Sequence, residues 1–101
     1  MTPEDLATFC ATIPRLKKKG TASRPAWYVD DRLVVRLEDA TTLTIRCAID
    51  LREDLVAQHP ETFGVPPRFE SHLKVQADLT HGNDADLKRA IRSAYHLQRK
   101  A

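Results

Sequence analysis

Several cations in this chain of 101 residues stand at alternate positions of short apolar segments. Arg32 and Arg36 alternate with leucines and valines, and Arg46 and Lys74 lie in two further segments of the same kind. Side chains at every second position of a strand point to one face of a sheet. Cations gathered there can neutralise phosphates, and an exposed aromatic such as Trp27 can stack on a base. The pattern therefore predicts a basic sheet face, which a nearby lysine run would extend: Lys17, Lys18 and Lys19.

Other kinds of site lack their signatures in the sequence. Gly20, Gly64 and Gly82 stand alone, so there is no glycine-rich phosphate loop, and the four histidines show no metal-ligand spacing. No nucleophile motif is present. The adjacent Asp30 and Asp31 are typical of a turn, where such side chains bond to the backbone. We therefore expect a non-enzymatic domain with no cofactor and no metal.

The net charge of +2 does not by itself indicate a nucleic-acid partner, but its distribution is uneven. Residues 15–36 carry seven bases against two acids, and residues 88–101 carry five bases and no acid. Basic patches of this kind indicate anionic partners. The alternative interpretation is that both patches are solvated surface.

The composition, with 42% hydrophobic and 30% charged residues, is typical of a globular protein in water. No apolar run approaches the ~20 residues of a membrane span, and the first residues show no signal-peptide pattern. Cys10 and Cys47 fit buried free thiols of a reducing compartment. We expect a single domain over residues 1–101, cytoplasmic and monomeric, with no membrane partner.

The apolar periodicity predicts three helices and about four strands. Thr2 would cap the first helix, which ends before Pro14, while Asp50 and Asp84 would cap the other two. The segment 17–23 is expected to be a flexible loop. The expected strands cover residues 26–29, 32–37, 42–48 and 72–79. This order, α-β-β-β-α-β-α, predicts an α/β (α+β) fold with an antiparallel sheet and helices mainly on one face.

The length of the turn at residues 30–31 decides which face Trp27 joins, because a shift of one residue exchanges the two faces of a strand. With a two-residue turn, Trp27 lies opposite Val34 on the outer face and Tyr28 lies in the core. With a three-residue loop, Trp27 and Val29 turn inward instead. We favour the two-residue turn, since such turns match the twist of the strands.

Six segments follow one another in a recognisable order: RPAWYV, DDRLVVRLED, TTLTIRCAID, HPETFGVPPRF, SHLKVQADL and ADLKRAIRSAYHLQRK. Together they cover nearly the whole chain and resemble the MmcQ/YjbR-like family. The resemblance implies a small bacterial protein with a CyaY-like (frataxin-like) fold and a DNA-binding role. By position, Trp27 matches the family's aromatic in the first strand, Arg32 a lysine after the first turn, and Tyr95 the aromatic of the last helix. The fold's association with iron needs an acidic first helix, which Glu4 and Asp5 alone do not supply.

The residues and the resemblance together predict DNA binding through the outer sheet face, with contacts mostly to phosphate. The residues expected to make these contacts are Trp27, Arg32, Arg36, Arg46, Lys74, Lys17, Lys18 and Lys19. The second interpretation is a protein-interaction module anchored by Trp27.

Overall fold

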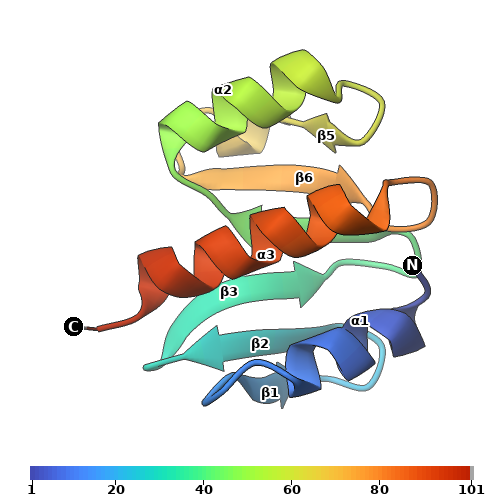
Figure 1. The fold of residues 1–101 in the computed structure, drawn as a ribbon, viewed down its shortest axis with the longest axis vertical. Helices are drawn as coiled ribbons and strands as arrows, with labels where there is room; N and C mark the ends of the chain where they lie inside the picture. Colours follow the sequence, from blue (N-terminus) through green and yellow to red (C-terminus); the bar gives the residue numbers. More distant parts are fainter. Residues whose placement is uncertain (101) are drawn as a thin grey trace.

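The chain forms an α+β fold in which a six-stranded antiparallel sheet carries three helices on one face (Figure 1). The computed structural model describes residues 1–100. The helices are α1 (Pro3–Ala11), α2 (Ile49–Gln58) and α3 (Asp84–Gln98), and a 3-10 turn, η1, covers Pro67–Phe69. The strands are β1 (Lys17–Gly20), β2 (Pro25–Val29), β3 (Arg32–Leu37), β4 (Thr42–Arg46), β5 (Phe63–Gly64) and β6 (Lys74–Asp78). They lie in the order β1-β2-β3-β4-β6-β5.

The prediction of about four strands, and with it the order α-β-β-β-α-β-α, is wrong. The expected loop at residues 17–23 contains β1, which pairs with β2 from Lys17 to Gly20. All four residues of β1 are exposed, so this edge strand has no alternation of apolar and polar residues to reveal it. The other missed strand, β5, is only two residues long.

The face of the sheet beneath the helices holds the core. One row of paired residues crosses four strands through Trp27, Val35, Ile45 and Val75, and every one of these side chains is buried. Apolar residues of the three helices pack on this face, among them Leu6, Phe9, Leu55, Leu87 and Ile91. Full burial of one such side chain stabilises the fold by about 1.5–3 kcal/mol. The alternation therefore fixes which face the helices cover.

A β-bulge in β3 reverses the expected positions of the two aromatic residues of β2. The turn has two residues, as predicted, and both have positive φ, +50° at Asp30 and +62° at Asp31. However, Tyr28 pairs with Leu33 and Trp27 pairs with Val35. Val34, which lies between these two residues of β3, therefore has no partner in β2. The extra residue shifts the register. Trp27 is consequently in the core and only 3% exposed, which makes its expected place on the outer face wrong, and Tyr28 lies on the outer face.

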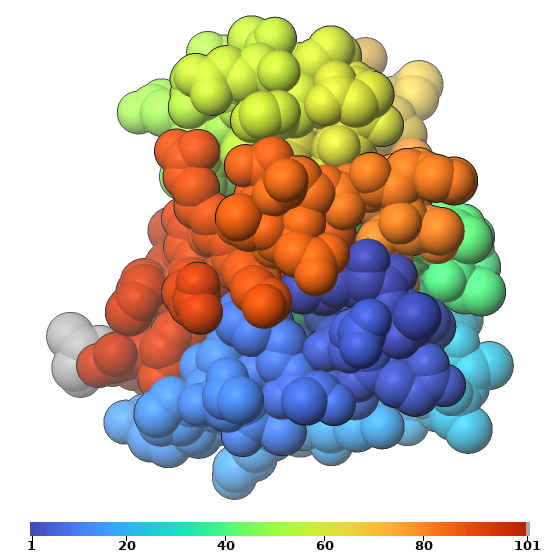
Figure 2. Space-filling model, turned by 45° about the vertical axis from the view of Figure 1, so that its right-hand side comes forward, coloured from blue at the N-terminus to red at the C-terminus, as the bar shows by residue number. Residues whose placement is uncertain are grey.

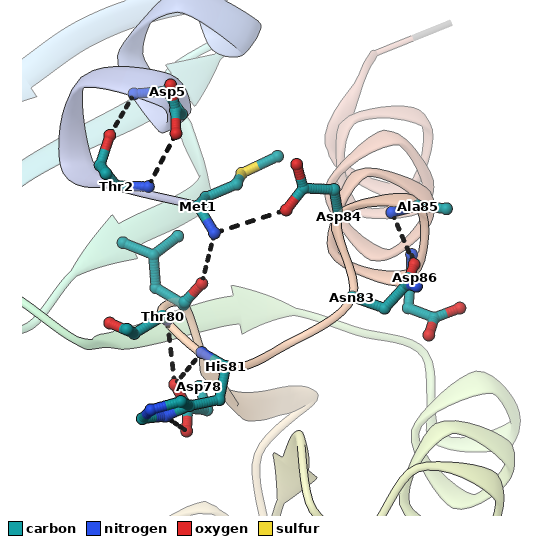
Figure 3. A network of polar contacts seen from close by, with 11 residues as sticks. Met1, Thr2, Asp5, Asp78, Thr80, His81, Asn83, Asp84, Ala85 and Asp86 are labelled. Atoms are coloured by element: carbon teal, nitrogen blue, oxygen red, sulfur yellow. Dashed lines mark hydrogen bonds and ion pairs between the residues drawn. The ribbon is translucent and has the colours of Figure 1, made fainter.

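Polar contacts fix the helix ends, and Figure 3 shows those at one end of the molecule. Thr2 caps α1, as predicted, and exchanges hydrogen bonds with Asp5. The cap of α3 is Asn83 rather than Asp84, since the amide oxygen of Asn83 accepts from two backbone N–H groups of the first turn. The predicted cap at Asp50 is also wrong, because α2 begins at Ile49, so that Asp50 lies inside its first turn, and the N-cap residue Ala48 makes no side-chain hydrogen bond.

On the helix side, α1 and α3 are in contact (Figures 1 and 2). Lys88 and Arg92 of α3 lie 5.5 and 5.0 Å from the ring centre of Phe9 in α1. Among residues 1–100, none of the helices has both the length and the apolar character needed to cross a membrane.

Candidate nucleic-acid interface

The sheet face opposite the helices carries two rows of polar side chains. In the first row Arg36, Thr44 and Gln76 are paired across β3, β4 and β6. In the second row Arg46 of β4 pairs with Lys74 of β6. Residues paired across antiparallel strands point to the same side. We call this side the open face, since the three helices all pack on the other one (Figure 1).

A hollow lies on the open face where the sheet meets η1. Its lining residues come from the sheet, from η1 and from the chain before β2: Arg24, Arg36, Glu38, Thr44, Arg68, Phe69, His72 and Lys74. Four of these are permanent cations and one is an acid. A concave surface with this excess of positive charge attracts anions.

The single acid of the hollow is already engaged. Glu38 accepts hydrogen bonds from the guanidinium of Arg24 and, at 3.0 Å, from the hydroxyl of Thr44. Burial of Glu38 is the largest single effect and opposes its ionisation, but the hydrogen bonds from Arg24 and Thr44 and the positive charges of Arg24 and Arg36 together lower the pKa of Glu38 below its ordinary value. Glu38 is therefore an anion at neutral pH and offsets Arg24. Arg36, Arg68 and Lys74 form no ion pair within residues 1–100.

The wall formed by η1 is held in place by Arg52 of α2. Nη1 of Arg52 donates to the carbonyl oxygens of Phe69, His72 and Lys74, at 3.0, 2.7 and 3.2 Å. Arg52 is 7% exposed, and buried hydrogen bonds from a charged donor are among the stronger ones. Above this anchor, the guanidinium of Arg68 and the ammonium of Lys74 lie 4.7 and 5.7 Å from the centre of the Phe69 ring. Both cations therefore lie close to the Phe69 ring, in the lining of the hollow.

Tyr28 is the aromatic residue of the sheet that lies on the open face. Its hydroxyl accepts a hydrogen bond from Arg36 at 3.2 Å, and Nζ of Lys19 lies 5.3 Å from its ring centre. Lys19 also pairs with the exposed Asp31 at 3.2 Å. The half-buried Leu33 is the partner of Tyr28 in β3. Tyr28 thus lies between Arg36 of the hollow and the β2–β3 turn, where the cations Lys17 and Lys19 lie beside the two aspartates of the turn.

The structure brings five of the eight residues predicted for the site onto the open face: Lys17, Lys19, Arg36, Arg46 and Lys74. It separates the other three from them. Trp27 is in the core, and Lys18 is paired with it, with its ammonium 5.9 Å from the indole ring. Arg32 pairs with the buried Val29 and shares its side of the sheet. The expectation that Trp27 and Arg32 lie beside Arg36 is therefore wrong.

Sequence reasoning missed Tyr28, Arg24, Arg68 and the anchor Arg52. Tyr28 points outward because of the β-bulge in β3, and no residue type in the sequence indicates that bulge. Arg68 and Arg52 come together only through the tertiary contact between η1 and α2. A signal for the η1 wall was nevertheless present, since Pro66-Pro67 beside an aromatic indicates a rigid, packed segment rather than a free loop.

The comparisons with known proteins identify a fold. No family model matches the chain, and no curated protein matches it either. A crystal structure of the Deinococcus radiodurans protein DR2400, with a domain described as DUF419, superimposes with a TM-score of 0.80 at 17% sequence identity. The match covers 95% of this chain and 77% of that one. At this identity the similarity establishes that the two chains share a fold, and the neighbour's domain is one of unknown function.

Proposed function

We propose that this protein is a non-enzymatic module that binds DNA through the open face of its sheet, mainly by contacts to phosphate. The observation that supports the proposal is a set of four cations: Arg36, Arg68 and Lys74 line the hollow, and Arg46 is paired with Lys74 on the open face. These side chains form no ion pair within residues 1–100, so their charges are available to phosphate oxygens. The resemblance of the sequence to the MmcQ/YjbR-like family, which is commonly labelled DNA-binding, supports the same proposal.

The alternative of a protein-interaction module anchored by Trp27 loses its basis. A hot-spot anchor must be free to enter a pocket of the partner, and Trp27 is 3% exposed beneath the helices. We therefore do not propose that function.

The salt dependence of binding tests the proposal. Four cations that each neutralise a phosphate give log K against log salt a slope of about −3 to −4. Arg36→Glu combined with Arg46→Glu should abolish binding at low salt. The matched control is Arg92→Glu combined with Arg99→Glu, which makes the same charge change on the helix side of the molecule. Binding by the folded sheet-face variant that equals that of the control would contradict the proposal.

A further inference from the structure

We propose that the DNA bound by the open face is single-stranded, and that Tyr28 stacks on one of its bases. This inference rests on the proposed function, because it uses the same face and the same phosphate contacts. It adds a residue that distinguishes a single strand from a duplex.

The inference is based on the position of Tyr28 on the open face, beside Arg36 and Lys19. The ring lies on the open face, and Arg36 holds its hydroxyl at 3.2 Å, so the ring is oriented by a residue of the hollow itself. Lys19 lies over the ring at 5.3 Å, but this side chain is exposed and has a second partner in Asp31. Because Asp31 already holds its ammonium at 3.2 Å, the exposed Lys19 side chain can leave the ring when a base arrives and contact a phosphate beside it. Such a combination of an aromatic ring and neighbouring cations is typical of single-strand binding surfaces.

The shape of the open face agrees with a single strand. A protein reads duplex DNA by placing a helix or a β-ribbon in a groove. All three helices pack on the other face of the sheet (Figure 1), and the only helical segment bordering the open face within residues 1–100 is the three-residue η1. A duplex also keeps its bases stacked inside, where the Tyr28 ring cannot reach them. A single strand exposes its bases and can follow the face from Tyr28 to the hollow, where Arg36, Arg68 and Lys74 are placed to meet its phosphates.

The experiment compares two substitutions at Tyr28. Tyr28→Phe keeps the ring and removes the hydroxyl, whereas Tyr28→Leu keeps an apolar side chain and removes the ring. Fluorescence anisotropy would measure the binding of each variant to an oligodeoxythymidine of about 12 nucleotides, within the site sizes known for sheet-based binders. The same measurements on a duplex, and on an abasic strand with the same phosphates, are the ligand controls. Circular dichroism and the emission of the buried Trp27 would verify folding.

We expect the wild-type protein to bind the oligodeoxythymidine more tightly than the duplex. Tyr28→Phe should stay within about threefold of wild type, and Tyr28→Leu should bind the oligodeoxythymidine on the order of 5- to 100-fold more weakly. On the abasic strand and on the duplex, the two variants should not differ. Tighter binding of the duplex, or equal loss on the normal and abasic strands, would overturn the inference while the proposed function stands. Absence of binding to every probe at low salt would overturn the proposed function itself.

Discussion

Replacement of Arg52 by methionine should destabilise the protein and loosen the wall of the hollow. Methionine keeps much of the apolar stem and removes the guanidinium that donates to the carbonyl oxygens of Phe69, His72 and Lys74. One Nη1 has two hydrogens, so the three contacts amount to about two full hydrogen bonds. Buried bonds from a charged donor contribute about 1.5–3 kcal/mol each, which gives an upper range of about 3–6 kcal/mol.

Water can replace part of this loss, because the carbonyl oxygens of His72 and Lys74 are only partly buried. We therefore expect Arg52→Met to lower the free energy of unfolding by about 2–4 kcal/mol. A domain of this size has about 5–15 kcal/mol of stability, so the variant should still fold. Urea unfolding followed by circular dichroism would measure the difference. Trypsin should also cleave the variant faster in the segment 65–73, because the wall is released first.

The control for Arg52→Met is the same substitution on an exposed helix position. Arg89 forms a single ion pair, with Asp54 at 3.7 Å, and both side chains are about half exposed. Such pairs contribute at most about 1 kcal/mol. If Arg52→Met has no larger effect than Arg89→Met, the three hydrogen bonds do not hold η1 in the way described.

Three further predictions concern the turn, the thiols and acid stability. Asp31→Gly should raise the free energy of unfolding by about 0.5–1 kcal/mol, because glycine adopts positive φ without strain, whereas Asp30→Gly should lower it. The two variants should differ because the carboxylate of Asp30 accepts a hydrogen bond from the backbone N–H of Lys100 at 2.8 Å, which glycine cannot do. Chemical denaturation of the two variants would measure the difference in their free energies of unfolding. Burial raises the pKa of Cys10 to about 12 and that of Cys47 to about 11, so both thiols should react with Ellman's reagent at pH 8 only after denaturant is added. The N–H of Lys100 lowers the pKa of Asp30, so the folded state binds this proton less readily than the unfolded state. The resulting stability is present above the usual aspartate pKa and decreases as the pH falls below it; thermal unfolding at pH 7 and pH 3 should show a smaller decrease for Asp30→Asn than for wild type.

The regular strands could be predicted from the sequence, and the irregular ones could not. Apolar and polar residues alternate along the predicted segments of β3 and β4, because each strand has one face in water and one face under the helices. This alternation identifies the central residues of both strands. β1 was not predicted because its three consecutive lysines show no alternation of apolar and polar residues. β5 was not predicted because two residues are too few for an alternation to appear. The main feature that the sequence did not predict is the bulge at Val34, which changes the register between β2 and β3. Apolar residues that follow one another fit either face, so the sequence does not reveal which of them is the extra one.

The candidate site was predictable where it depends on strand register alone. Arg36, Arg46 and Lys74 lie on one face because Arg46 pairs with Lys74, and Arg36 pairs with Thr44, which is two residues from Arg46 on the same strand. The hollow beside them needs Arg68, and the contact that places Arg68 joins residues seventeen or more apart in the chain. Spacing in the sequence carries no information about contacts of that kind.

The lysines of β1 also bear on how the sheet ends. An edge strand offers unpaired backbone groups to any extended chain that approaches it, and this is how many β proteins grow into fibrils. A second copy that joined antiparallel at β1 would set lysine against lysine, and β5 at the other edge offers only two residues. Charge repulsion between lysines therefore disfavours pairing at the β1 edge, and the β5 edge is too short to pair with another chain. The chain can therefore keep a broad sheet face free for a ligand without the sheet becoming a template for its own aggregation.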